Sequence, residues 1–198
     1  MISAVDALER LRDGNRRFVD GTINKIELVT QAKRSELAQG QSPFAVIVAC
    51  SDSRVPVELI FDQGFGNLFV IRVAGNIVAP SQIGSVEFAA AQLGTKLVVV
   101  LGHSNCGAID ATLTELAREQ SRLSPNLRAI VDRIRPALEP LIDDNVSLHE
   151  AVVANVRHSV SRLRHGSLLL EQLIERGDLT VVGAEYSIES GAVEFFDS

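Results

Sequence analysis

Two short segments carry the residue types that could do chemistry together. The first is CSDSR, with Cys50, Asp52 and Arg54 at alternate positions, and the second is HSNC, with His103 and Cys106 three residues apart. Two thiolates, an imidazole and a carboxylate are ligand types that suit tetrahedral zinc. Each motif alone is common by chance. Together they contain both cysteines of the chain, and they favour a metal site over two buried cysteines that act as small apolar residues beside a turn histidine.

Each motif follows a predicted buried strand. Residues 44–49 and 97–101 are short, nearly continuous apolar runs, which is typical of strands buried on both faces of a parallel sheet. In open α/β sheets, ligands bind beyond the carboxyl ends of the strands. If the two strands are neighbours, Cys50, His103 and Cys106 converge at one edge of the sheet. The N-terminus of the helix predicted next would favour the thiolate form of Cys106.

The rest of the chain fits one α/β domain over residues 1–198, built on a single sheet. Further strands are predicted at 68–73, 179–188 and 192–196, the last two as a closing hairpin, and helices at 3–21, 30–37, 85–93, 108–119, 127–142 and 147–176. The first of these helices is amphipathic, so one side of it needs an apolar partner.

Composition excludes several classes of partner. The formal charge of −6 and the pI near 5.2 argue against a nucleic-acid or anionic-membrane surface, because phosphate binding needs clustered Lys and Arg. The first residues lack the basic start and continuous apolar core of a signal peptide, and no apolar run approaches the roughly 20 residues that span a bilayer. We therefore expect a soluble, cytoplasmic protein with reduced cysteines.

Asp52 and Arg54 allow two interpretations from their types alone. They could be a loop carboxylate and a solvent-facing arginine without a shared role. Alternatively, a site with two cysteines and one histidine needs a fourth position, which Asp52 either occupies or is kept from by Arg54. The sequence pattern leaves both open.

Four segments resemble the β-class carbonic anhydrases: CSDSRVPVE, FVIRVAGN, GSVEFAAAQLG and VVVLGHSNCGAIDA. The resemblance extends from about residue 7 to residue 196 and is most specific over residues 41–109. It implies a single mixed sheet, with a parallel four-stranded core and an added antiparallel strand, flanked by helices. It also implies that the N-terminal helices, within residues 1–40, clasp a second subunit in a homodimer or a higher even oligomer.

The resemblance implies a catalytic zinc ion, one per chain, held by Cys50, His103 and Cys106. It gives Asp52 the part of a switchable fourth ligand and catalytic residue. It pairs Asp52 with Arg54, which keeps the carboxylate off the metal.

Four further residues are implied to contact the substrate. Gln41, in GQSPF, corresponds to a glutamine that crosses the dimer interface and donates a hydrogen bond to the substrate. Phe69 and Phe88 fall where the family lines a small apolar pocket for CO₂, although Phe88 replaces a tyrosine found in some members. Gly107 lies directly beside the expected metal ligand Cys106.

A second bicarbonate pocket, allosteric in another branch of the family, matches in part. Arg72 and Tyr186 correspond to two of its members, but Ile47 stands where the third, a tryptophan, is expected. Ile47 lacks an indole N–H, so we expect weak or absent inhibition through this pocket. For Arg72, the interpretation that we favour is that of a structural ion-pair partner.

The implied function is zinc-dependent, reversible hydration of carbon dioxide to bicarbonate and a proton by a metal-bound hydroxide. A hydrolase on the same scaffold that acts on carbonyl sulfide or carbon disulfide is an alternative, because these molecules are linear and nearly isosteric with CO₂. A non-catalytic zinc or bicarbonate-sensing protein is disfavoured, because Asp52, Arg54 and Gln41 are all present.

Overall fold

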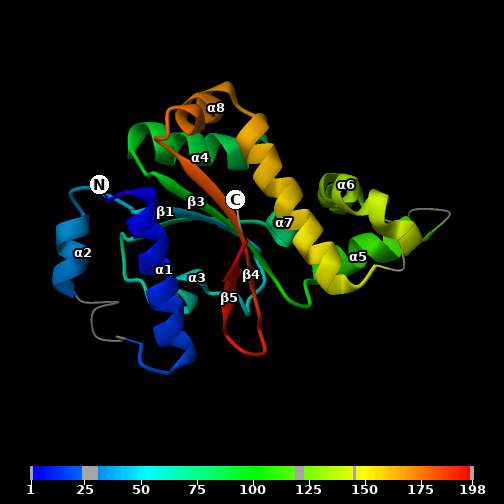
Figure 1. The fold of residues 1–198 in the computed structure, drawn as a ribbon, viewed down its shortest axis with the longest axis horizontal. Helices are drawn as coiled ribbons and strands as arrows, with labels where there is room; N and C mark the ends of the chain where they lie inside the picture. Colours follow the sequence, from blue (N-terminus) through cyan, green and yellow to red (C-terminus); the bar gives the residue numbers. More distant parts are fainter. Residues whose placement is uncertain (1, 24–30, 119–122, 145, 197–198) are drawn as a thin grey trace.

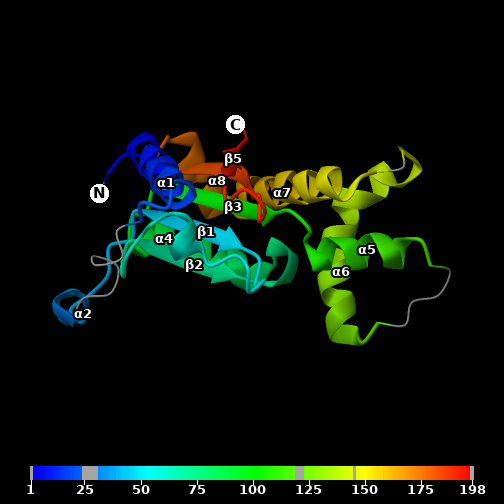
Figure 2. The same ribbon diagram turned by 90° about the horizontal axis from the view of Figure 1, so that it is seen from below.

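Five strands form one sheet in the order β2-β1-β3-β4-β5 (Figures 1 and 2). The structure is a computed structural model that describes residues 2–23, 31–118, 123–144 and 146–196. The strands are β1 (Ala45–Ala49), β2 (Leu68–Arg72), β3 (Leu97–His103), β4 (Thr180–Tyr186) and β5 (Val193–Phe195). The pairings of β2 with β1, β1 with β3 and β3 with β4 are parallel, and that of β4 with β5 is antiparallel. The predicted mixed sheet is confirmed.

Helices cover both faces of this sheet. They are α1 (Ala4–Val19), α2 (Gln31–Leu37), α3 (Val57–Ile60), α4 (Pro80–Gln92), α5 (Gly107–Leu116), α6 (Pro125–Leu138), α7 (Leu148–His165) and α8 (Leu168–Glu175), with short 3₁₀ helices η1 (Ala74–Asn76) and η2 (Glu139–Asp144). Figures 1 and 2 place α2 at one end of the molecule and α5 and α6 at the other. Among the described residues, no helix combines the length and the apolar character needed to cross a membrane.

The core has two layers, because the side chains of a strand alternate between its faces. On one face, Ile47 and Val99 pack with residues of α1 and α3. On the other, Val46 and Val98 pack with residues of α4, α7 and α8. β1 and β3 are buried along their whole length, which explains why their sequences are nearly continuous apolar runs.

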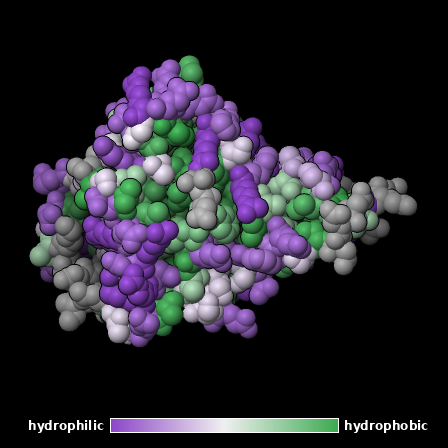
Figure 3. All heavy atoms as spheres, in the orientation of Figure 1, coloured by the Kyte–Doolittle hydropathy of each residue, from purple (hydrophilic) through white to green (hydrophobic). Residues whose placement is uncertain are grey.

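The amphipathic helix α1 uses its apolar side within its own chain. Ser3 caps the helix by accepting a hydrogen bond from the backbone N–H of Asp6, at 3.1 Å. Ala7 and Leu11 are fully buried against the sheet. The outward side of α1 is hydrophilic (Figure 3). Much of the apolar side of α1 is therefore buried inside this chain, whereas Val5 and Val19 at its two ends remain exposed.

Two helix boundaries differ from prediction. The single helix expected at 147–176 is two helices, because the hydroxyl of Ser167 caps α8 by accepting from the N–H of Leu170 at 3.3 Å. The same hydroxyl lies 2.5 Å from Oε1 of Glu87, which ties the start of α8 to α4. The helix expected from residue 85 begins at Pro80, whose fixed φ suits a first turn.

Other predicted boundaries are close to those found. The helix expected to reach residue 142 ends as an α-helix at Leu138 and continues as η2. The expected first residue of the second helix, residue 30, and the expected last residue of the helix at 108–119 lie outside the described residues.

A matched pair of glycines tests how α1 is packed. A Cβ at Gly14 would lie 1.8 Å from the carbonyl oxygen of Phe61, whereas one at Gly84, in α4, would meet nothing within 4 Å. We expect Gly14→Ala to lower the free energy of unfolding by about 1–3 kcal/mol through overpacking. Gly84→Ala should raise it by roughly 0.5–1 kcal/mol, because alanine is the better helix former. Urea unfolding followed by circular dichroism measures both, and a Gly14→Ala protein as stable as wild type would contradict this packing.

Candidate metal centre and active site

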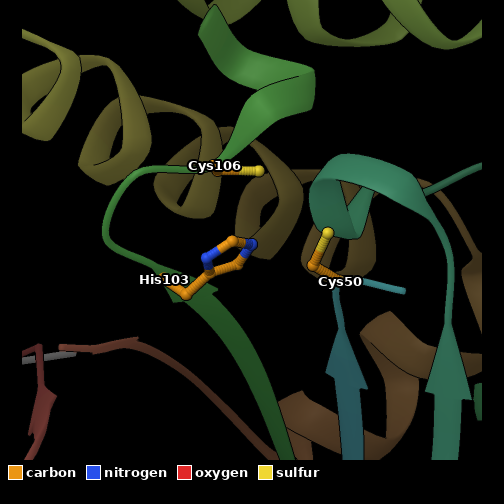
Figure 4. A group of neighbouring side chains, drawn as sticks. All are labelled: Cys50, His103 and Cys106. Carbon is orange, nitrogen blue, oxygen red and sulfur yellow. The ribbon is translucent and has the colours of Figure 1, made fainter. Parts of the chain in front are cut away.

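The parallel pairing of β1 and β3 brings the two sequence motifs together. Ala49 is paired with Leu101, so both strands end at the same edge of the sheet. Cys50 follows β1, His103 ends β3, and Cys106 directly precedes α5. One ligand atom from each of these three residues lies within 4.8 Å of the others, and all three residues are buried. Their side chains point toward one another in Figure 4.

The orientation of the His103 imidazole suits binding of a cation through Nε2. It is fully buried, and its Nδ1 lies 2.9 Å from the carbonyl oxygen of Ser104. A carbonyl oxygen only accepts hydrogen bonds, so Nδ1 carries the proton and Nε2 keeps its lone pair. Within the described part of the chain, Nε2 has no hydrogen-bond partner. A buried lone pair without a donor, beside two sulfurs, fits a thiophilic metal ion such as zinc.

The two sulfurs interact with each other and with backbone N–H groups. The pKa of Cys50 is lowered, chiefly by a hydrogen bond from Cys106 and further by N–H groups that include Gly75, at 3.3 Å. The pKa of Cys106 is raised, chiefly because it shares a proton with Cys50 and because it is buried. One thiol of the pair therefore ionises readily and the second resists, since two adjacent thiolates repel each other. A divalent cation between them neutralises both charges.

Asp52 and Arg54 form a two-pronged ion pair at the rim of this cluster. Arg54 donates from Nε to Oδ1 at 2.9 Å and from a terminal nitrogen to Oδ2 at 2.7 Å. These hydrogen bonds hold the pKa of Asp52 well below its usual range. Oδ2 of Asp52 lies 3.9 Å from Nε2 of His103, and Arg54 also donates to the carbonyl of Asn105. The arginine is thus engaged with the carboxylate and with the loop that precedes Cys106.

Arg72 supports the loop after β1 from the neighbouring strand β2. Its guanidinium donates to the carbonyl of Cys50 at 2.9 Å and to the carbonyl of Asp52 at 2.6 Å. These partners are backbone carbonyls, whereas the sequence suggested an ion pair. Two strands separate Arg72 on β2 from Tyr186 on β4, and Ile47 is fully buried in the core. Weak inhibition through the second bicarbonate pocket stays a prediction.

The four expected substrate contacts divide into two groups within one chain. Gly107 lies at the start of α5, beside Cys106. Gln41 precedes β1, whereas Cys50 follows it. An extended strand rises about 3.3 Å per residue, so Gln41 and Cys50 lie at opposite ends of β1. Phe69 is paired with Val46 near the start of β1, and its ring centroid lies 6.3 Å from that of the half-exposed Phe88. Gln41 and the two phenylalanines do not reach the group of Cys50, His103 and Cys106 in their own chain.

Sequence reasoning missed three residues that shape the site: Ser104, Gly75 and Asn105. Gly75 and Asn105 have positive φ angles of 69° and 56°, a conformation that glycine and asparagine adopt most easily. A glycine just after β2 and an asparagine between the two expected ligands were the available signals. Ser104 acts through its backbone carbonyl, so its residue type carries no signal.

The fold and this site identify the family. A family model described as carbonic anhydrase matches residues 45–193, and the chain belongs to that family, which hydrates carbon dioxide. A carbonic anhydrase of Mycolicibacterium smegmatis is 38% identical over 194 residues, covering 96% of this chain and 92% of the relative. Carbonic anhydrase 2 of Mycobacterium tuberculosis is 37% identical over 188 residues, covering 94% of this chain and 90% of the relative.

Solved structures assign the β class. The β-carbonic anhydrase CcaA superposes with a TM-score of 0.74 and 29% identity, covering 97% of this chain and 88% of that one. The Coccomyxa β-carbonic anhydrase, solved in complex with acetazolamide, superposes with a TM-score of 0.75 and 25% identity, covering 96% of this chain and 86% of that one. The resemblance inferred from the four sequence segments is confirmed.

Replacing one sulfur tests the metal site. We expect wild type to hold about one zinc per chain and Cys106→Ser to lose it on dialysis together with activity, because serine is a poor ligand for zinc. Ile109→Val, a buried change on the first turn of α5, is the matched control and should keep its zinc. Metal analysis of the three proteins decides, and full zinc content in Cys106→Ser would remove Cys106 from the ligand set.

Proposed function

We propose that this chain is a zinc-dependent enzyme that catalyses the reversible hydration of CO₂ to bicarbonate and a proton. The observation that carries the proposal is the buried cluster of Cys50, His103 and Cys106 beside a carboxylate held by an arginine. Family membership supports the reaction, and the donor set supports the metal. The two free thiols suit a reducing compartment, which supports a cytoplasmic location.

Cys50, His103 and Cys106 are the proposed zinc ligands. When bound, zinc supplies a Lewis acid that lowers the pKa of water at its fourth position. The carbonyl of Ser104 holds the ring of His103 with Nε2 facing the two sulfurs. The backbone N–H of Gly75 restrains the sulfur of Cys50.

Asp52 is the proposed acceptor that orients the attacking water. Arg54 donates to Oδ1 from both its backbone N–H and its Nε, and to Oδ2 from one terminal nitrogen, so Oδ2 is the oxygen that keeps a further acceptor site. The low pKa of Asp52 keeps it ionised, so it accepts a hydrogen bond and does not donate one. Because Arg54 is itself fixed on the carbonyl of Asn105, it restrains Asp52 from becoming a metal ligand.

The substrate pocket is proposed to be shared between two copies of the chain in a homodimer. In their own chain, Gln41, Phe69 and Phe88 lie away from the proposed zinc ligands, so they could contact substrate only at the site of a partner subunit. β2 is an edge strand of the sheet, and Phe88 beside it is 49% exposed, which gives a second copy an apolar surface to cover. Helices within residues 1–40 are the proposed clasp. Ala7 and Leu11 of α1 are already buried in their own chain, so we favour α2, which projects at one end of the molecule (Figure 2), for this contact.

Side-by-side turnover tests the proposed reaction. Purified, zinc-loaded protein should hydrate CO₂ in a stopped-flow assay, and the rate should fall when the metal is removed. Carbonyl sulfide is the competing substrate, because it has the same linear shape. Zinc-loaded protein that hydrolyses carbonyl sulfide and leaves CO₂ unchanged would overturn the proposed reaction.

The pair of Asp52 and Arg54 can be tested apart from the ligands. We expect Arg54→Ala to keep near-normal zinc and to lose about 10- to 100-fold in kcat, because the carboxylate is no longer held. Arg54→Lys should lie between, since an ammonium cannot make the two-pronged contact. Arg16→Ala removes an exposed arginine paired with Asp13 and serves as the control. If Arg54→Ala were as active as wild type, Asp52 would not depend on the arginine.

Complementation tests whether Gln41 acts across the dimer. Gln41→Ala and Cys106→Ser should each be nearly inactive alone. In a dimer that contains one copy of each, the Gln41→Ala chain offers an intact ligand set and the other chain offers an intact Gln41. After mixed refolding in equal amounts, activity should recover to about a quarter of wild type, since half of the dimers are mixed and each has one complete site. No recovery, with mixed dimers demonstrated by mass spectrometry, would contradict sharing.

A further inference from the structure

We propose that Asn155, on α7, is a positioning residue for the sulfur of Cys50 and acts through the backbone of Gly75. The inference rests on the zinc site of the proposed function and deepens it. Asn155 follows Gly75 by 80 residues in the chain, and its amide Nδ2 donates to the carbonyl of Gly75 at 2.9 Å. The N–H of Gly75 in turn donates to Sγ of Cys50 at 3.3 Å.

The turn that carries Gly75 is unusual in its backbone and tightly packed. Gly75 and Asn76 have positive φ angles of 69° and 43° in succession. A Cβ at Gly75 would lie 2.8 Å from Cδ1 of Ile134 and 3.2 Å from the Cβ of Ala108. Two consecutive left-handed residues need outside contacts to stay in place. In Figure 4 this turn, η1, lies beside Cys50.

A second donor on α7 holds the next carbonyl of the same turn. Ser159, one helical turn after Asn155, is 2% exposed and donates from its hydroxyl to the carbonyl of Asn76 at 3.2 Å. Residues four apart lie on one face of a helix, so α7 offers two donors to two successive carbonyls. The helix itself is fixed on the sheet through fully buried Val156. A rigid element far along the chain therefore holds the turn in the conformation in which the Gly75 N–H is directed at Cys50.

The chemistry of Asn155 argues for a role beyond stability. Its side chain is 1% exposed, and its Oδ1 has no hydrogen-bond partner within the described residues. A buried oxygen without a donor carries a desolvation penalty that an apolar residue of similar size avoids. The hydrogen bond from the Asn155 amide to the carbonyl of Gly75 explains a polar residue at this position. Through it, Asn155 keeps the N–H of Gly75 directed at the Cys50 thiolate, which stabilises the negative charge and fixes the sulfur before the metal binds.

The test compares two buried asparagines by metal binding. Asn155→Leu removes the donor to Gly75. Asn15→Leu, the matched control, removes an amide that is 6% exposed and donates to the carbonyls of Ile60 and Gly191, away from the metal cluster. The zinc dissociation constant is measured by competition with a chromophoric chelator. The sulfur-to-cobalt charge-transfer absorption of the Co²⁺-loaded protein reports the geometry at the sulfurs.

We expect Asn155→Leu to raise the zinc dissociation constant about tenfold and to shift the charge-transfer band. Asn15→Leu should lower the melting temperature without moving either readout. An unchanged dissociation constant and band in Asn155→Leu would overturn the proposal, and so would equal shifts in both variants. If Asn155→Leu does not fold, Ser159→Ala replaces it in the same test. We expect Ser159→Ala to change the zinc dissociation constant and the charge-transfer band in the same direction by a smaller amount. An unchanged dissociation constant and band would overturn the proposal.

These readouts separate the inference from the proposed function. Wild-type protein that binds neither Zn²⁺ nor Co²⁺ would overturn both. Wild-type protein that binds metal and hydrates CO₂, with Asn155→Leu and Ser159→Ala indistinguishable from it in affinity and spectrum, would overturn the role of α7 alone.

Discussion

The parallel pairing of β1 with β3 is the constraint on which the site depends. Parallel neighbours lie about 4.8 Å apart and end at the same edge of a sheet, so the chain leaves both strands beside the same point in space. Cys50 and His103 meet there without any long loop. The left-handed conformation of Asn105 then turns the chain so that Cys106 stands at the start of α5, close to both. Everything else at the site refines an arrangement that the sheet has already imposed.

Two arginines bind the loops around this point into one unit. Arg54 connects the loop after β1 with the loop after β3, through Asp52 and the carbonyl of Asn105. Arg72 connects β2 with the loop after β1, through two backbone carbonyls. A guanidinium is suited to this because it presents several donors in a rigid plane. Apart from the contact of Arg54 with the carboxylate of Asp52, these donors are directed at backbone carbonyl oxygens, so the loops that carry the expected metal ligands are restrained largely without further negative charge.

The sequence revealed the sheet and the expected ligands more readily than the contacts that restrain them. Buried parallel strands require continuous apolar runs, and cysteine and histidine are rare enough for their positions to be informative. Ser104 acts through its backbone carbonyl and Gly75 through its backbone N–H, so no side-chain chemistry marks either role in the sequence. Ser167, which ends one helix and caps the next, lies in a region whose periodicity fits a single long helix. Amphipathicity showed that one side of α1 is buried, but it does not say which chain buries it.

Under the proposed function, the two halves of the active site have different origins. The metal ligands and the pair of Asp52 and Arg54 come together inside one chain, from strands that pair directly. Gln41 lies at the opposite end of β1, and the exposed Phe88 lies on α4 beside Phe69 of the edge strand β2, so only a second copy could bring these residues to the metal. Metal binding then requires only a folded chain, whereas turnover also requires association. Dilution below the dissociation constant of the dimer would separate these two properties, with zinc retained and activity lost.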